Sequence, residues 1–456
     1  MAGVFKNVVN LLSLSVLAVL NSSGPLLAQS LSSVVNGITA SPTQISPQSA
    51  HLNPALIGYC RHTQIEGSMN LMWGWMRYQR TGRDPNTGGR YGSSDTNSLG
   101  PVPSISICSD FGSEKFRFGY NSYFPSGVMA NFDAKGSQRY DLISGLIIPW
   151  HHQFTIAYQP SSEWSFGLSA IYSVAFLESE LEVDLSEFMR SVINAEDMPA
   201  EHASLAARAQ IPFSTSHSYG LGAGIHWWPT YQWSFGLSFF APVAYEFDSE
   251  LILRTPSLVQ NMGSSLRALG GEGDIENSVR AKSTLPAYIV AGVRYQPFGY
   301  WTGDYFGRYS FNSWNRTLSL TVKNSPVASL RDYSRDGAPL NDSWMIGTVQ
   351  TFNLWREWSF GLTAIYATSA IDDHMLSVSQ ADFDSTTVGV FTQYKFLDRW
   401  TIGAEYAHHF YGNRSATNTY EAKASLSKSD ILKPISSDGA YRASANRLGV
   451  NLRYDF

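Results

Sequence analysis

The residue types that most often carry out chemistry occur in this sequence without the spacing that catalysis or metal binding needs. His151-His152 and His408-His409 are adjacent pairs. Neighbours on a strand point to opposite faces, so neither pair is expected to chelate one metal ion. The glycines within 220–224 alternate with apolar residues and no helix follows them, which argues against a phosphate-binding loop. Gly-x-Ser-x-Gly, His-Glu-x-x-His and paired-cysteine zinc motifs are absent. We therefore predict no enzyme activity, no cofactor and no metal site.

The two cysteines, Cys60 and Cys108, are the remaining reactive side chains. Cys108 follows Ser104 and Ser106 at intervals of two residues, so on a strand all three share one face, which we expect to point inward. In an oxidising compartment the two thiols could form a disulfide or stay separate. The sequence leaves both alternatives open.

Composition limits the class of protein. Of 456 residues only 15% are charged, 14% are aromatic and 37 are glycine. After the first 20 residues no stretch approaches the ~18 consecutive apolar residues of a transmembrane helix. The net charge of −5 is spread along the chain without a Lys/Arg block, so nucleic acid is not an expected partner.

The N-terminus has the pattern of a secretory signal. Lys6 precedes the apolar run 8–20, and a break rich in Ser, Gly and Pro leads to Ala28. We predict a signal peptide over 1–28. Residues 29–62 are rich in small, polar and proline residues and show little periodicity. This range is predicted to be an N-terminal plug inside a lumen, or else a periplasmic tail.

A short phrase marks the elements that follow. Trp-Ser-Phe-Gly-Leu stands at 164–168, 233–237 and 358–362, and Trp-Thr-Ile-Gly-Ala stands at 400–404. Read by twos, each copy has an apolar face that begins with Trp and a face of small residues, as expected for a barrel wall between lipid and lumen. We predict an all-β transmembrane antiparallel barrel over 63–456. Its fourteen predicted strands are 63–79, 102–111, 115–124, 143–159, 163–181, 215–228, 232–251, 281–297, 312–324, 343–354, 357–370, 384–397, 399–412 and 442–456.

The connections alternate between short turns and long loops, which is typical of bacterial outer-membrane barrels. The short turns should be periplasmic, so each copy of the phrase should begin a strand at the periplasmic rim. The range 298–311 breaks the alternation, because it should be a short turn but is long and aromatic. The chain ends on Phe456, which resembles the signal that the barrel-assembly machinery reads in outer-membrane proteins.

Alternation also places several charges on the lumen face, where they should pair with one another or with the plug. An arginine or lysine among them could instead bind a carboxylate ligand, and Arg294 is the strongest candidate. The predicted lumen charges are Glu66, Arg117, Arg294, Lys395, Glu405 and Arg453.

One long loop has helical periodicity. In 182–214 the apolar residues fall at i, i+3, i+4, i+7 and i+8, and a second helix could run from Pro199 through 200–209. The helices could form a ligand groove at the outer mouth, or they could pack only on each other and on the rim. The groove candidates are Leu185, Phe188, Met189, Val192 and Ile193.

The motif Asn53-Pro54-Ala55 stands just before the first strand and resembles an element of the outer-membrane FadL family of long-chain fatty acid transporters. The order of parts is also similar, including the prolines at 101–103, the helical third loop and the Leu285-Pro286 strand start. The resemblance covers nearly all of the mature chain. It implies a monomeric barrel in the outer membrane of a Gram-negative bacterium, closed by a plug.

The same resemblance implies a route. Hydrophobic ligands would bind first in a groove near 182–214 and 252–280 and then in an inner pocket. A shift of the plug would release them sideways into lipid beside a kinked third strand, 115–124. No basic residue can be matched to one that holds a carboxylate in that family, so fatty acids and other hydrophobic compounds both stay open. The alternatives are a FadL-like barrel serving secretion or adhesion, and a general porin.

Overall fold

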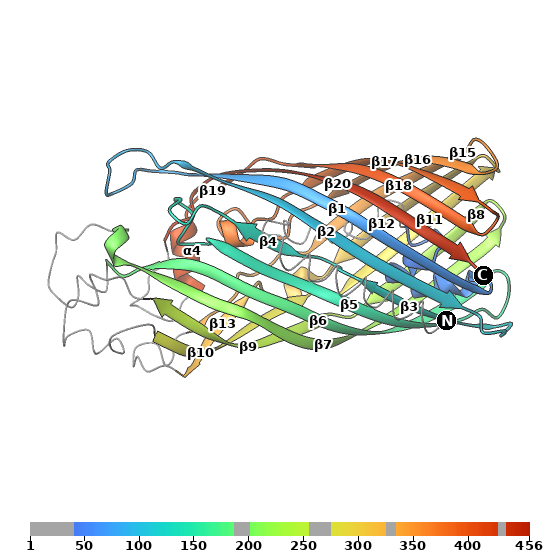
Figure 1. The fold of residues 1–456 in the computed structure, drawn as a ribbon, viewed down its shortest axis with the longest axis horizontal. Coiled ribbons are helices and arrows are strands. Elements are labelled where there is room, and N and C mark those ends of the chain that lie inside the picture. Colours follow the sequence, from blue (N-terminus) through green and yellow to red (C-terminus); the bar gives the residue numbers. More distant parts are fainter. Residues whose placement is uncertain (1–40, 187–200, 255–274, 325–333, 427–434) are drawn as a thin grey trace.

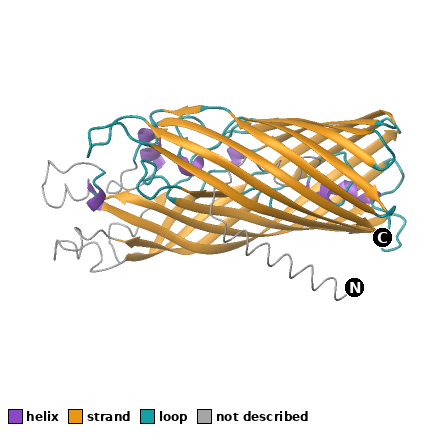
Figure 2. Cartoon of the chain, turned by 45° about the horizontal axis from the view of Figure 1, so that its top comes forward, coloured by secondary structure: helices purple, strands orange, loops and turns teal. Residues whose placement is uncertain are grey.

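The computed structural model describes residues 41–186, 201–254, 275–324, 334–426 and 435–456. The predicted signal peptide, 1–28, lies outside these residues. The strands close into a tilted antiparallel barrel, with short helices inside it or at its ends (Figures 1 and 2). Among the described residues, no helix is long and apolar enough to cross a membrane.

The barrel has fourteen antiparallel spans, as predicted. Within the described residues, six of the spans consist of two strand elements each. The undivided spans are β1 (Thr63–Arg80), β2 (Ser93–Ser109), β5 (Ser144–Tyr158), β6 (Trp164–Asp184), β7 (Ala206–Thr230), β16 (Trp358–Ala367), β17 (Ser385–Phe396) and β20 (Gly439–Asp455). The divided spans are β3 (Phe116–Tyr123) with β4 (Val128–Asn131), β8 (Trp233–Phe240) with β9 (Val243–Arg254), β10 (Ile275–Leu285) with β11 (Tyr288–Phe298), β12 (Trp301–Ser310) with β13 (Ser319–Asn324), β14 (Ser334–Arg335) with β15 (Ser343–Asn353), and β18 (Trp400–Tyr411) with β19 (Arg414–Ala416). The helical elements are η2 (Gln48–His51), η3 (Pro54–Tyr59), η4 (Ala203–Leu205), η7 (Asn312–Trp314), η9 (Val378–Gln380) and α4 (Thr419–Leu426).

Closure is made by the first and last strands. β1 pairs with β20 from Gln64↔Asp455 to Arg80↔Gly439, and the backbone N–H of Phe456 donates to the carbonyl oxygen of Thr63 at 2.9 Å. No sheet edge is left between these two strands, which removes unpaired backbone groups from the wall.

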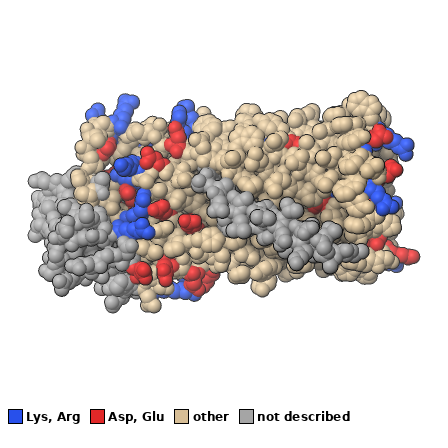
Figure 3. Space-filling view, in the orientation of Figure 1, with Lys and Arg blue, Asp and Glu red and all other residues tan. Residues whose placement is uncertain are grey.

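The wall alternates between an outward apolar face and an inward face. Leu168, Leu221 and Leu237 point outward and are exposed by half or more. Ser165 and Ser169, on the opposite face from Leu168 in the same strand, are buried. Each copy of the tryptophan phrase begins a strand, namely β6, β8, β16 and β18. Lys, Arg, Asp and Glu gather mostly toward the two ends of the barrel and leave a largely uncharged band between them (Figure 3). This band has the surface that a lipid bilayer requires.

One predicted connection and the predicted strand after it were wrong in position. The range 298–311 is not a long connection, because Trp301–Ser310 forms β12 and only Gly299-Tyr300 make the turn. The predicted strand 312–324 therefore begins too late and contains the short helix η7 and then β13. With β12 in place, this turn is as short as the others at its end of the barrel.

Two long loops were also predicted too long. β2 begins at Ser93 instead of 102, and β7 begins at Ala206 instead of 215. The predicted second helix through 200–209 is therefore wrong over 206–209, where Asp184↔Ala206 and Val183↔Ala207 continue the hairpin of β6 and β7. Backbone pairing extends the hairpin beyond the apolar band and overrides the local helical pattern.

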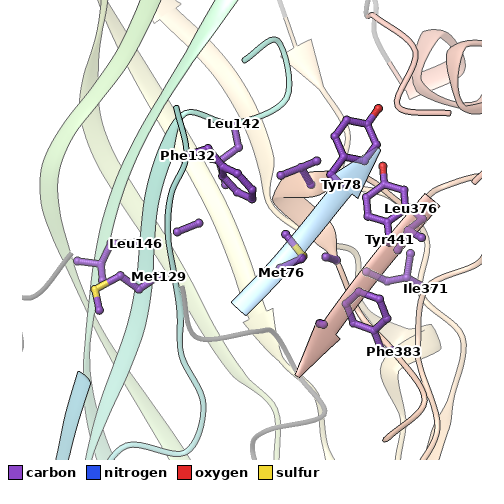
Figure 4. Packing of buried hydrophobic residues seen from close by; sticks show 14 of the residues in the cluster. Met76, Tyr78, Met129, Phe132, Leu142, Leu146, Ile371, Leu376, Phe383 and Tyr441 are labelled. Atoms are coloured by element: carbon purple, nitrogen blue, oxygen red, sulfur yellow. The ribbon is translucent and has the colours of Figure 1, made fainter. Parts of the chain in front are cut away.

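Protein segments fill the lumen at both ends of the barrel. At the long-loop end, residues 124–143 and 370–383 fold inward and bury apolar side chains against β1, β5 and β20. Figure 4 shows Tyr78 and Tyr441 side by side in this cluster, with Phe132 and Leu142 beside each other on the loop across from them. At the short-turn end, the N-terminal segment (residues 41–62) occupies the interior.

The N-terminal segment lies directly against wall backbone. A Cβ atom added at Gly167 would lie 2.3 Å from the carbonyl carbon of Pro54, and one at Gly224 would lie 2.1 Å from Oδ1 of Asn53. An added Cβ would lie 2.3 Å from the carbonyl oxygen of Pro42 at Gly236 and 2.6 Å from Cγ of Pro42 at Gly292. The register pairs Gly167 with Gly224 and Gly236 with Gly292, so the four residues form a strip without side chains across β6, β7, β8 and β11. We call it the glycine strip.

Adding one methyl group to the glycine strip should displace the N-terminal segment. In Gly224→Ala the new Cβ overlaps Asn53, and we expect the free energy of unfolding to fall by about 1–3 kcal/mol, as is usual for overpacking. Urea unfolding in lipid vesicles measures this change. The matched control is Gly307→Ala, whose Cβ would meet its nearest neighbour, the Met345 carbonyl oxygen, at 3.5 Å. Equal stability of the two variants would contradict the close approach.

Candidate functional site

The Asn-Pro-Ala motif shapes the turn that enters η3. Asn53 has extended backbone (φ −150°, ψ 106°), and its Oδ1 accepts from the N–H of Ala55 at 3.1 Å as an N-cap. Pro54 follows at the first helical position, where its missing N–H costs nothing. The Nδ2 of Asn53 donates to the carbonyl oxygens of Pro42 and Ile225, both at 3.1 Å. The three residues of the motif are completely or nearly completely buried.

Polar wall side chains satisfy the carbonyl groups of the N-terminal segment. Asn121 donates to Pro47 at 2.8 Å and Gln153 donates to Ala50 at 2.9 Å. Ser165, the serine of the first tryptophan phrase, donates to the carbonyl oxygen of Ala55 at 2.7 Å. Since buried carbonyl groups need partners, these contacts explain why the inward faces of β3, β5 and β6 are polar.

The two cysteines are joined at the exit of the N-terminal segment. The structure forms a disulfide between Cys60 and Cys108 of β2, with their Cα atoms 6.3 Å apart. Arg117 donates from Nε to the carbonyl oxygen of Cys60 at 2.7 Å. Its Nη1 donates to the carbonyl oxygens of Ser113 and Phe116, so this predicted lumen charge holds the chain near the disulfide.

The other predicted lumen charges also make internal contacts. Arg294 and Asp304 form a two-point ion pair at 2.9 and 3.1 Å, and Asp304 accepts from Thr43 at 2.6 Å. Glu405 lies 2.9 Å from Nη2 of the fully buried Arg447, which the sequence reasoning did not single out.

The last two charges lie next to each other near the closure of the barrel. Glu66 is buried beside Asn451, and Arg453 lies 3.5 Å from Asp455. A ligand-binding role for any of the six predicted lumen charges stays a prediction. Lys395, at the short-turn rim, is exposed.

Above the N-terminal segment the barrel encloses two adjacent cavities. The first, of about 60 Å³, is lined by His51 and Leu52 of the segment and by apolar residues of the wall, including Ile171 and Val243. The second has a volume of about 140 Å³ and reaches Ile371 of an inward loop. Both are lined by Ser126 and Leu285, so we treat them as one space and call it the lumen chamber.

The chamber has one strongly polar corner. Arg308 of β12 lines it, half-buried, with its guanidinium carbon 3.9 Å from the ring centre of Tyr288 and its Nε 3.1 Å from Oγ of Ser310. His151 faces the same cavity and lies 3.2 Å from the hydroxyl of Tyr245. Sequence reasoning missed Arg308, because it assigned 298–311 to a connection. The alternation of Thr302, Asp304, Phe306 and Arg308 was the signal that could have found it.

A larger hollow, of about 620 Å³, lies on the outside of the barrel. Its lining includes Phe166, Leu168, Ile225 and Leu237, all of which are exposed outward from the wall. It overlies the glycine strip, where the wall carries little side-chain bulk. Lipid chains cover such a surface, so this hollow is separate from the lumen chamber.

The predicted loop groove lies mostly beyond the described residues. Leu185 is buried at the end of β6, where its N–H donates to the carbonyl oxygen of Leu205 at 3.0 Å. Phe188, Met189, Val192 and Ile193 lie outside the described residues. The groove therefore stays a prediction.

Comparison with known families and structures agrees with this architecture. The sequence model of the family described as Outer membrane protein transport protein (OMPP1/FadL/TodX) matches residues 30–456. The chain belongs to this family. FadL/TodX proteins are outer-membrane transporters of hydrophobic compounds in Gram-negative bacteria, and the chain is assigned to that membrane and that class of transport.

Solved structures share the fold at low sequence identity. A Pseudomonas aeruginosa FadL homologue superposes with a TM-score of 0.74 at 15% identity, covering 95% of this chain and 100% of that one. The P. putida toluene transporter TodX gives 0.66 at 13% identity, covering 93% and 97%. The monoaromatic hydrocarbon channel CymD gives 0.62 at 14% identity, covering 94% and 98%. No curated protein sequence shows significant similarity to this chain.

The N-terminal segment should respond to pH through His51. Burial lowers the pKa of His51 to about 4, and the positive charge of Arg308 acts in the same direction, whereas its hydrogen bond to the Gln48 carbonyl opposes them. The unfolded chain binds a proton near pH 6.5 and the folded chain does not, so stability falls as the pH drops from about 6.5 toward 4.

We expect a loss of roughly 2 kcal/mol between pH 7 and 4.5 from this group. Protection factors of residues 41–62 measure it, from hydrogen exchange followed by mass spectrometry and corrected for the intrinsic exchange rate at each pH. His51→Gln should remove most of the pH dependence of these protection factors. An unchanged pH dependence in that variant would show that other groups cause it.

Proposed function

We propose that this FadL/TodX protein transports long-chain fatty acids, passively, through the lumen chamber. The observation that carries the proposal is the composition of that chamber. Arg308 supplies a cation at one corner, and Ile171, Phe240, Val243 and Leu285 supply apolar surface. A guanidinium binds a carboxylate through charge-assisted hydrogen bonds, while the acyl chain gains from burial.

The proposed route follows the geometry of the wall. A ligand is captured at the long-loop end, by the predicted groove that includes Leu185, and then enters the chamber. Residues 29–62 act as a plug, whose described part supplies His51 and Leu52 to the chamber floor. A shift of the plug enlarges the chamber, and the ligand leaves sideways into lipid. No energy source beyond binding and the concentration gradient is needed.

The break between β3 and β4 supports sideways release. β2 pairs with β3 only from Ile105↔Ser122 to Ser109↔Phe118, and β4 has ladder pairs only with β5. Pro101 and Pro103 of β2 have no N–H to donate, so this part of β2 cannot form a complete ladder. Pro125 and Ser126, between β3 and β4, line the chamber directly.

Single-ring hydrocarbons are the second candidate ligand. The 140 Å³ cavity is close to the roughly 150 Å³ of an apolar protein cavity that holds one benzene. TodX is named a toluene transporter and CymD a monoaromatic hydrocarbon channel, and both share this fold.

We further propose that the protein acts as a monomer and that Phe456 is read by the barrel-assembly machinery during insertion.

Arg308 distinguishes the two ligand classes. Arg308→Met removes the cation but keeps an apolar chain, so oleate should bind about tenfold more weakly or worse, whereas toluene uptake should be unchanged. Arg308→Lys should recover part of the oleate affinity. Arg442→Met, at an exposed arginine of β20, is the control for a general loss of arginine charge.

The measurements are uptake of labelled oleate and labelled toluene by cells with and without the gene, and mass spectrometry of hydrophobes retained by the purified protein. Equal loss of both ligands in Arg308→Met would contradict a carboxylate site. No uptake of either ligand by the wild type, with no retained hydrophobe, would reject both candidates.

A further inference from the structure

A second stretch of the wall lacks a backbone ladder. On one side, β7 pairs with β6 almost continuously from Trp164↔Trp227 to Asp184↔Ala206. On the other side, it pairs with β8 over 222–230 and with β9 only over 208–210. We call the intervening contact, between 216–221 of β7 and 241–246, the β7–β9 seam.

Serine side chains take the place of ladder bonds along the seam. Oγ of Ser218 donates to the carbonyl oxygen of Ala244 at 2.5 Å, and Oγ of Ser216 accepts from the N–H of Glu246 at 3.0 Å. At the edge of the seam, the backbone N–H of Ala241 donates to the carbonyl oxygen of Leu221 at 2.9 Å. A hydroxyl that bridges two strands holds them farther apart than a direct N–H to carbonyl bond does.

Two prolines, at the same height in the barrel wall, explain why the backbone ladder is interrupted at the seam. Ala241-Pro242 separates β8 from β9, and Pro286-Ala287 separates β10 from β11. The register places the two breaks side by side, because Phe240 pairs with Tyr288 below them and Val243 pairs with Leu285 above them. Proline cannot donate to a ladder, so neighbouring strands change direction together at this point.

The lumen chamber lies directly behind the seam. Phe240, Ala241 and Val243 line its smaller cavity, and Tyr245 lines its larger one. Ser126 of the β3–β4 break lines both cavities. One chamber therefore touches two separate interruptions of the wall.

We propose that the β7–β9 seam is a second lateral exit from the lumen chamber, for hydrophobic ligands passing into the lipid. Its residues on the inward face of β7 are small, namely Ser216, Ser218 and Gly220, whereas Tyr219 and Leu221 are largely exposed toward the lipid. Opening the seam breaks the hydrogen bonds of Ser216 and Ser218 instead of a continuous backbone ladder. The inference rests on the proposed transport function and adds a route to it.

Gly220 allows the seam to be locked reversibly. A Cβ added there would lie 2.7 Å from Cγ2 of Val243, across the seam, and 3.6 Å from Cβ of Ile171, across the intact ladder with β6. Both neighbours are near enough for a disulfide. Gly220→Cys with Val243→Cys is the test variant, and Gly220→Cys with Ile171→Cys is the matched control. Each pair replaces the same glycine and one apolar residue that lines the chamber.

Uptake of labelled oleate and toluene is measured for oxidised and dithiothreitol-treated cells of both variants and of the wild type. Mass spectrometry verifies each engineered disulfide, and the treated wild type corrects for reduction of Cys60–Cys108. If release through the wall limits the rate, locking one of two similar exits lowers uptake about twofold, and reduction restores it. The control variant should be insensitive to oxidation.

The outcomes separate the two proposals. Uptake that is present in all forms, but equal in the oxidised and reduced test variant, overturns the second exit and leaves the transport function intact. Equal inhibition of the test and control variants overturns it as well, because a constrained Gly220 alone would then explain the loss. Absence of uptake by the wild type rejects oleate and toluene as ligands and, with this proposed function, the exit that rests on it.

Discussion

The rest of the structure depends on a direct contact between two stretches of backbone. The turn at Asn53-Pro54 lies against the glycine strip at distances that leave no room for a Cβ atom on Gly167 or Gly224. Close contact buries the carbonyl and amide groups of the turn, which would be costly without partners. Asn53 resolves this, because one side chain both caps η3 and bonds to Ile225 of the wall. The height of the N-terminal segment in the barrel is thereby fixed, and with it the floor of the lumen chamber.

The N-terminal segment also contacts several of the predicted lumen charges or their partners. Arg294 is engaged with Asp304, which in turn accepts from Thr43 of the N-terminal segment. Arg117 holds the carbonyl oxygen of Cys60. These two charges therefore have partners within the protein, as expected where an isolated buried charge would be costly. Arg308 differs from them because it lines the chamber above the segment and packs on the ring of Tyr288.

The period-two pattern was sufficient to predict the barrel and its number of spans, because alternation is local and each strand shows it independently. It failed at β12, where the aromatic rim around Gly299-Tyr300 hid a two-residue turn and where Asp304 and Arg308 interrupt the uncharged inward pattern. The tryptophan phrase was predicted as wall alone. In its first two copies the glycine, Gly167 or Gly236, also receives the N-terminal segment.

In the last two copies of the phrase, the same glycine makes room for a neighbouring side chain, since a Cβ at Gly361 would overlap Phe391 and one at Gly403 would overlap Asn451. One residue type thus serves two kinds of close packing at one position of a repeated phrase. The partners lie tens to more than a hundred positions away in the sequence, so no local pattern could assign them.

A barrel wall is most stable when every backbone group is paired, because the bilayer offers no alternative partner. This wall departs from complete pairing beside the lumen chamber, at the β3–β4 break and, separately, at the prolines 242 and 286 of two adjacent spans. Elsewhere, as between β17 and β18, twelve successive residue pairs run from Ser385↔Tyr411 to Phe396↔Trp400 without a break. The interruptions have a common consequence. A hydrophobic molecule in the chamber is separated from lipid by side chains and a few hydrogen bonds instead of a full ladder, so the shortest path to an apolar environment runs through the wall and avoids the water at either end of the barrel.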